Sequence, residues 1–542
     1  MSADTPVRRA LTGATALRGG GRWRPTPYRL AGLLCWLALS LAFWAVPLCC
    51  DAGLHAAAVE RLRDDLLHPR HPTADLPGAG SPAYTPYALA QGVFARVTEL
   101  GGREVLRLAG PLNLLVLLAG LGRFVRVLSP RRWAPVLALA GVTLLWGAQA
   151  GGWSGGPGPA YTLPYPSVLA AGLTFWAWAL TGARARDTEP VRHVGPGGLR
   201  GLPGYAGLGV LYGLVLLVHP ATGVVAGAGA AALVAGWQRG WRWALAGRWA
   251  LTGAVALLVG AVWPYFDVVA AAGRPGAGIR ATGGALWPAL LGLPALWLRA
   301  RRGPRWDPLV LMAVLGGALA WYGQVGGHSG YEGMLWLAAV ASVCALAVEL
   351  AAPRPWPVRR RVLGAAATAG AGAALLGVTA GGVVPGAPDP AVSASSRWPD
   401  YTWAARHIGR GEVVITDGAH AARTLPGYGP YLVAPVVPDA ALDAREREAA
   451  VRVFLDPGSA SAERAALARR YRVRWLLLTP RTPLPAEAVV VAWSRQTGEV
   501  LARVGGGAAG AGDAGGRAAP PRPAPGHSMT RSTGMLPRVA FE

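Results

Sequence analysis

Long apolar stretches recur between residue 30 and residue 385, and this feature constrains the fold more than any other. Each stretch is long enough to cross the hydrocarbon core of a bilayer as a helix, which takes about 20 apolar residues. The chain of 542 residues is 52% hydrophobic and only 15% charged, so it has too little polar surface to cover these stretches in water. The sequence therefore predicts about eleven transmembrane helices, with centres near residues 40, 115, 142, 174, 211, 230, 256, 291, 316, 342 and 373.

The basic residues predict how these helices are oriented. The chain contains no lysine, which fits GC-rich bacterial coding, so its net charge of +24 is carried by arginine. Basic residues concentrate in the cytoplasmic loops of membrane proteins. We therefore expect the basic segment 1–29 in the cytoplasm and, after an odd number of helices, the C-terminal part outside the plasma membrane. The arginines gather in alternate loops, at 123–132, 184–200, 239–248, 299–305 and 354–361, whereas the short loops of the other side hold only Arg274 and Arg280.

Two kinds of partner are not expected from the sequence. The arginines are scattered through short loops rather than gathered on one face, so the charge does not indicate a nucleic acid partner. Cys35 and Cys344 lie in apolar spans, and Cys49 and Cys50 are adjacent at a membrane boundary. This spacing gives neither a disulfide framework nor a zinc site.

A long loop of residues 51–105 follows the first span and is predicted to fold outside the membrane. It opens with Asp51, where the first helix leaves the lipid, and a carboxylate there is costly unless it is used or capped. Apolar residues at every fourth position from Leu54 predict a helix that lies on the membrane surface. A second helix is predicted to start at Pro86, a good first-turn residue. On the polar face of the first helix we expect Glu60, Arg61, Arg63 and Asp64.

The chain changes character after Pro385, where a Pro- and Gly-containing stretch at 386–390 predicts a linker. A small extracytoplasmic α/β domain is expected over 386–504, behind a transmembrane domain over 30–385. Its strands are predicted at 412–416, 431–437, 474–479 and 488–493, and its helices at 443–455 and 460–471. Residues 505–542 lack apolar periodicity and are predicted to be disordered.

This arrangement resembles the GT-C superfamily of polyprenyl-phosphate-dependent glycosyltransferases. The shared features are a cytoplasmic N-terminus, a first helix that delivers Asp51 to a long outer loop with two surface helices, a polytopic helical bundle and an outer α/β domain. The resemblance implies sugar transfer from a polyprenyl-phosphate donor to a cell-envelope glycan, lipid or protein, with Asp51 in the place of the catalytic carboxylate. The sequence has no acidic neighbour of Asp51, no Asp-x-Asp motif and no acid in the second outer loop, Gly151 to Pro166. No motif therefore supports a divalent metal.

The chemistry of such a transfer assigns roles to few residues. A base must take the proton of the acceptor hydroxyl, and Asp51 is the best-placed candidate. The leaving phosphate needs hydrogen-bond donors, and Asp267 and Glu332 are reserve candidates for a second acid. As substrate-binding candidates we name His55, His71, His219 and Arg280.

Each assignment has an alternative. Asp51 could cap the helix that begins near Ala52. His71 lies close to two prolines and could be a turn residue. His219 could be an interfacial anchor, and Arg280 could be a solvated side chain. For the whole protein, the alternatives are a transporter or flippase of a lipid-linked substrate, and a non-catalytic envelope assembly factor.

Overall fold

The computed structural model describes residues 26–77, 80–151, 159–186, 202–239, 241, 243–268, 286–302, 307–326, 329–352, 398–436 and 442–505. Several predicted features lie outside these residues. They are the N-terminal 25 residues, the span near residue 373, the linker at 386–390, Arg280 and the tail beyond residue 505.

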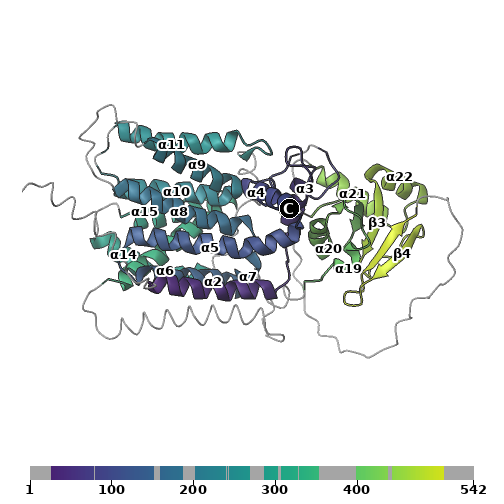
Figure 1. The fold of residues 1–542 in the computed structure, drawn as a ribbon, viewed down its shortest axis with the longest axis horizontal. Helices are drawn as coiled ribbons and strands as arrows, with labels where there is room; N and C mark the ends of the chain where they lie inside the picture. The colour runs from purple at the N-terminus through teal and green to yellow at the C-terminus, as the bar shows by residue number, and fades with distance from the viewer. Residues whose placement is uncertain are drawn as a thin grey trace, which may run out of the picture. The chain divides into compact units, whose positions relative to one another are not determined.

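Apolar helices side by side form the larger part of the described chain (Figure 1). Five of them, α2, α5, α10, α11 and α15, are long and apolar enough to cross a membrane. Large apolar side chains on their outer faces are exposed, including Leu41 at 70% and Leu257 at 66%, which suits lipid contact rather than water. The helices are α2 (Pro27–Ala45), α5 (Gly102–Leu128), α6 (Ala134–Gly151), α8 (Pro166–Arg186), α9 (Leu202–Val218), α10 (Pro220–Trp237), α11 (Trp243–Ala261), α15 (Pro308–Val325) and α16 (Leu335–Leu350).

The helices pack through aromatic rings and small residues. Phe124, Phe175 and Trp178 form a buried triangle with ring centroids 5.5 to 5.9 Å apart. A Cβ on Gly172 of α8 would lie 2.8 Å from the backbone nitrogen of Leu117 in α5. Only glycine therefore allows these two helices to approach so closely.

The predicted span near residue 291 differs in the structure. It is divided into α13 (Trp287–Leu290) and α14 (Leu293–Arg302). Gly292 lies at the break, and a Cβ there would be 2.2 Å from the carbonyl oxygen of Ser342. The close contact with α16 and the prolines at 288 and 294 favour two short helices over one long helix.

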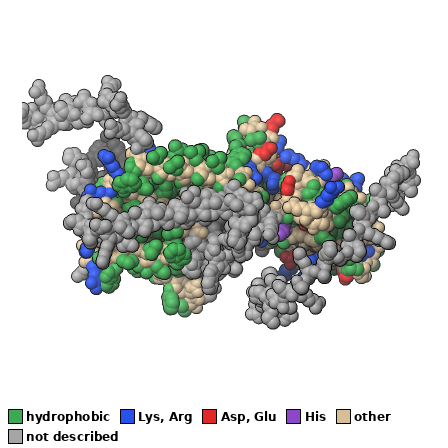
Figure 2. Space-filling model, turned by 90° about the horizontal axis from the view of Figure 1, so that it is seen from below, with side chains coloured by type: hydrophobic (Ala, Val, Ile, Leu, Met, Phe, Trp, Pro, Cys, Tyr) green, Lys and Arg blue, Asp and Glu red, His purple; other side chains and the backbone are tan. Residues whose placement is uncertain are grey.

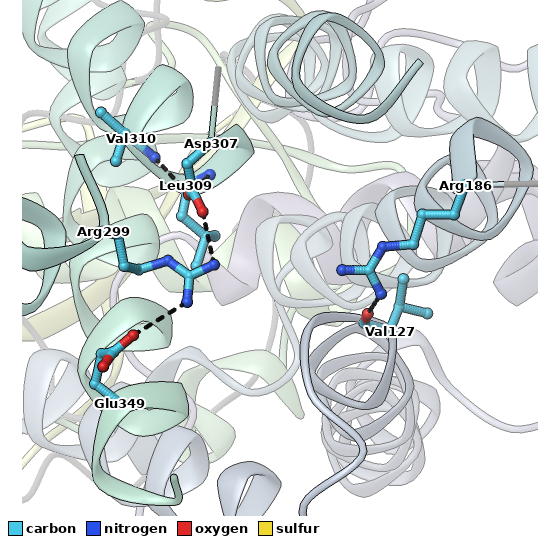
Figure 3. Close-up of polar contacts among 7 residues, drawn as sticks. All are labelled: Val127, Arg186, Arg299, Asp307, Leu309, Val310 and Glu349. Atoms are coloured by element: carbon cyan, nitrogen blue, oxygen red, sulfur yellow. Dashed lines mark hydrogen bonds and ion pairs between the residues drawn. The ribbon is translucent and has the colours of Figure 1, made fainter. Parts of the chain in front are cut away.

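Charged side chains tie the helices together at the end of the bundle where α14 lies (Figure 1). Arg299 pairs with Asp307 at 2.7 Å and with Glu349 at 3.5 Å. Asp307 also caps α15, because its carboxylate accepts from the backbone nitrogen of Leu309 at 3.0 Å. Figure 3 shows the Arg299 cluster and, facing it, Arg186, which donates to the carbonyl of Val127. Where Figure 2 shows the bundle in colour, hydrophobic side chains predominate and charged side chains gather toward its ends.

The outer loop contains the two predicted helices, α3 (Ala52–Asp64) and α4 (Pro86–Thr98). Pro86 stands in the first turn of α4, and the side chain of Thr85 caps that helix. Ala58 and Leu62 of α3 are fully buried against Tyr84 and Ala88, so the predicted apolar face is confirmed.

The expectation for the polar face of α3 was wrong for two of its four residues, since Asp64 is exposed and Arg63 is half-buried. Glu60 and Arg61 are each only 4% exposed, because Arg61 contacts the C-terminal domain and Glu60 lies between that domain and the start of α5. In Figure 1, α3 lies between the bundle and that domain.

The C-terminal domain is built on a sheet with strand order β2-β1-β3-β5-β4. Strand β1 pairs in parallel with β2 and β3, whereas β5 is antiparallel to β3 and β4. Strand β5 and the short helices α19, α20 and η5 were not predicted from the sequence. The elements are α19 (Thr402–Ala405), β1 (Val413–Thr416), α20 (Ala419–Thr424), η5 (Leu425–Tyr428), β2 (Tyr431–Leu432), α21 (Ala444–Leu455), α22 (Ser461–Tyr471), β3 (Val473–Leu478), β4 (Ala488–Trp493) and β5 (Val500–Val504).

Candidate functional site

Asp51 stands in the tight turn between α2 and α3, at the end of the bundle that meets the C-terminal domain. The turn contains a disulfide between the neighbouring residues Cys49 and Cys50, which the sequence analysis did not anticipate. Cys50 has a φ of 62°, a left-handed conformation that is uncommon outside glycine. Asp51 occupies the N-cap position of α3, but its side chain makes no capping hydrogen bond.

The carboxylate of Asp51 instead faces Arg423 of the C-terminal domain. The guanidinium Nη1 of Arg423 donates to Oδ1 of Asp51 at 2.7 Å. Both side chains remain partly open to solvent, with exposed fractions of 46% for Asp51 and 37% for Arg423. The cavity beside this pair is small, about 10 Å³, and it is lined by both residues and by Thr73.

Close backbone packing places Arg423 there. A Cβ on Gly53 would lie 1.9 Å from the carbonyl oxygen of Arg423, so α3 and α20 touch backbone to backbone. Gly427 of η5 packs in the same way against Gly53 and Ala56. Sequence reasoning missed Arg423 because α20 is only six residues long and has no apolar periodicity.

Buried charges of α3 hold the C-terminal domain in this position. Arg61 donates to the carbonyl oxygens of Gly429 and Pro430 at 2.7 and 3.1 Å, and its guanidinium lies 3.8 Å from the ring centroid of Tyr431. Glu60 pairs with Arg410 at 2.8 Å. A buried charge is costly unless it is paired or hydrogen-bonded, so these contacts make the domain an integral part of the site.

His55 lies near Asp51, and His219 lies near His55. The ring of His55, one turn along α3, is 5.5 Å from the ring of Tyr165, and the hydroxyl of Tyr165 donates to the carbonyl of Cys49 at 3.1 Å. Burial lowers the pKa of His55 to about 4, although the charge of Asp51 opposes this effect. Burial lowers the pKa of His219 to about 4 as well, and the neighbouring His55 lowers it further. Both imidazoles are therefore uncharged at neutral pH.

His219 combines a structural role with its position beside His55. Its Nδ1 accepts from the backbone nitrogen of Thr222 at 3.3 Å, which caps α10. Because Nδ1 is an acceptor, the proton of the neutral ring belongs on Nε2.

The other predicted residues are placed differently. His71 is 2% exposed, and its Nδ1 accepts from the backbone nitrogens of Thr73 and Ala74, so it shapes a turn in the outer loop. Asp267 is exposed in the segment after α11. Glu332 belongs to the short helix η4 (Ser329–Met334), and its side chain is outside the described residues, as is Arg280.

No three His, Cys, Asp or Glu side chains among the described residues are close enough to hold a metal ion. The pair of Asp51 and Arg423 provides charged groups at this site. The arrangement offers a carboxylate that can accept a proton, a guanidinium that can bind an anion, and two neutral imidazoles.

Comparison with solved structures decides the fold. The arabinofuranosyltransferase AftD from Mycobacteria superposes with a TM-score of 0.51 at 15% identity over 88% of this chain and 40% of that one. The chain has the GT-C fold. An R1389S mutant of AftD gives a TM-score of 0.52 at the same identity over 88% of this chain. The chain thus spans about two fifths of the length of AftD.

A second GT-C neighbour is the oligosaccharyltransferase AglB from Archaeoglobus fulgidus, in complex with an inhibitory peptide and a dolichol-phosphate. It gives a TM-score of 0.48 at 12% identity over 83% of this chain and 69% of that one. No family model and no curated protein matches the sequence. The GT-C fold thus rests on the similarity to AftD in the course of the backbone.

Proposed function

We propose that this protein is a membrane glycosyltransferase that moves a sugar from a polyprenyl-phosphate donor to an extracytoplasmic acceptor, which is a cell-envelope glycan, lipid or protein. The observation that carries the proposal is the position of the Asp51 carboxylate at the start of α3. Its carboxylate begins a helix without capping it, and it is partly exposed beside an arginine. A carboxylate at a membrane boundary that is not needed for the helix is available for chemistry.

The proposed mechanism assigns one step to Asp51. Its carboxylate takes the proton of the acceptor hydroxyl as that oxygen attacks the anomeric carbon, and the bond from the anomeric carbon to the phosphate oxygen breaks. The lipid phosphate leaves with the electron pair of that bond. Arg423 and the N–H of His219 are the donors that can stabilise its charge.

The orientation of the chain belongs to the same proposal. The arginine clusters at 123–132, 184–200, 239–248, 299–305 and 354–361 support a cytoplasmic location of those loops and of the N-terminus. Asp51, α3 and the C-terminal domain then face the outside. About eleven spans, including the one expected near residue 373, complete this topology.

Transfer by purified protein tests the function. The parent should transfer sugar from a polyprenyl-phosphate donor to an envelope-derived acceptor, and Asp51→Asn should lower turnover by about a hundredfold or more because the proton acceptor is lost. Arg96→Gln is a matched control, since Arg96 is an exposed residue near the end of α4. Near-parental activity of Asp51→Asn would make Asp267 or Glu332 the carboxylate to test. Inactive parent protein that moves lipid-linked substrate across vesicles would favour a flippase.

A further inference from the structure

A second cavity lies between the C-terminal domain and the outer loop, apart from the Asp51 site. Its volume is about 340 Å³, which is in the range of cavities that bind small molecules. Six charged side chains line it, three arginines and three acids. They are Asp75, Asp443, Glu446, Arg447, Arg470 and Arg472.

The outer loop forms one wall of this cavity. The backbone nitrogen of Leu432 in β2 donates to the carbonyl of Thr73 at 2.7 Å, so the loop follows the outer edge of the sheet. His71 fixes the turn that carries Thr73 and Ala74. Thr73 also lines the small cavity at Asp51, and Asp75, two residues later, lines the large one. One short segment of chain therefore adjoins both cavities.

The charged groups of the cavity balance one another. Arg470 pairs with Glu446, and Arg472 pairs with Asp75 at 3.3 Å. Asp443 caps α21 by accepting from the backbone nitrogen of Glu446 at 3.0 Å. With three positive and three negative residues, the lining has no net charge, which disfavours a strongly anionic ligand. The lining presents hydrogen-bond donors and acceptors side by side. A ligand rich in hydroxyl groups can bind to both, because each hydroxyl can donate and accept.

An aromatic ring lies among these polar groups. The guanidinium carbons of Arg447 and Arg470 are 5.4 and 5.3 Å from the ring centroid of Tyr471. Arg447 is also fixed by its bond to the carbonyl of Val433 at 3.0 Å. A sugar presents C–H groups on the faces of its ring and hydroxyl groups around its edge. An aromatic ring can pack against a C–H face, and polar side chains fixed beside that ring can hydrogen-bond to the hydroxyls.

We propose that this cavity is a subsite for a neutral glycan, and that it holds a sugar unit of the acceptor away from the reacting end. The assignment to an acceptor rests on the proposed glycosyltransferase function, whereas glycan binding itself does not require it. The shared wall at 73–75 places the subsite beside the small cavity at Asp51, so an acceptor chain held in the subsite could extend toward Asp51.

Binding of short neutral arabinan, mannan and glucan fragments to the full chain tests the proposal. The measurement uses the Asp51→Asn protein, so that no transfer takes place, and inorganic phosphate serves as the anionic probe. At least one neutral fragment should bind. Arg447→Gln should weaken that binding by about tenfold or more, because a charged hydrogen-bond donor is removed. Arg472→Gln should weaken it too, and this side chain is 75% exposed, so the change is tolerated by the fold.

Arg445→Gln is the matched control, because Arg445 is an exposed arginine on the same helix and does not line the cavity. It should leave binding unchanged. The proposal is overturned if no neutral fragment binds, if Arg445→Gln weakens binding as much as Arg447→Gln, or if only inorganic phosphate binds. A parent protein that binds a fragment but transfers no sugar would contradict the proposed function and leave the subsite standing.

Discussion

At the scale of single residues, the site depends on charges whose partners come from distant parts of the sequence. Asp51 could be selected from the sequence because an acid at the end of an apolar span is rare and costly. Its partner Arg423 could not be selected from the sequence, because nothing in the sequence distinguishes it from the many other arginines. The contact between the two residues depends on how the two domains pack. The same limit applies to His55, His71 and His219, whose different roles follow from burial and from local backbone nitrogens rather than from spacing.

Replacement of Asp51 should affect stability little. Asp51 makes no capping hydrogen bond, so Asp51→Ala loses only the partly exposed pair with Arg423, which is worth about 1 kcal/mol or less. Asp51→Asn and Asp51→Ala should therefore melt alike, within about 1 kcal/mol of the parent in free energy of unfolding. Thermal unfolding in detergent checks this. A markedly larger loss for Ala than for Asn would show that the side chain does cap α3.

The two half-buried imidazoles of lowered pKa should make the protein sensitive to acid. The pKa of His55 and of His219 is about 4 in the folded chain and 6.5 when unperturbed, so the unfolded chain binds more protons between these values. Stability is then fully present above pH 6.5 and falls as the pH is lowered toward 4. Melting temperatures across this window should decline less steeply for His55→Gln than for the parent. Equal slopes would mean that His55 is not buried as a neutral ring.

At the scale of elements, helices with strong periodicity were predicted well and short elements were not. The positions of α3 and α4 follow from apolar spacing and from Pro86. By contrast, α20 has six residues and β5 lies just before the low-complexity tail, so neither stands out in the sequence. The polar face of α3 was misassigned because charge alone does not tell a solvated face from one covered by another domain.

A substitution in α3 should separate the two domains. In Gly53→Ala, the added Cβ would meet the backbone of Arg423 at 1.9 Å, and a backbone contact cannot yield as a flexible side chain can. We expect faster proteolysis in the segment 419–428 and weaker transfer, with the bundle still folded. Gly247→Ala in α11 is the control, because nothing lies within 4 Å of its added Cβ. If the two variants are digested alike, the close packing of α3 and α20 is not present in solution.

At the scale of the whole molecule, the GT-C fold joins a helical bundle to a sheet domain through the outer loop. The apolar spans predicted the bundle because lipid allows few other structures. The docking of the domain could not be predicted, since it depends on the shape of Gly53 and Gly427 and on the buried side chain of Arg61. The outer loop thus contains Asp51 of the candidate site and also covers the edge of the sheet.

The orientation of the molecule gives the last prediction. If the arginine-rich loops are cytoplasmic, then α22 and the rest of the C-terminal domain face the outside. A cysteine introduced as Ser461→Cys, at the exposed start of α22, should react with a membrane-impermeant maleimide in intact cells. Arg301→Cys, exposed at the end of α14, should react only after lysis. The native Cys35 and Cys344 are buried and should give little background. The reverse pattern would place Asp51 in the cytoplasm and exclude an extracytoplasmic acceptor.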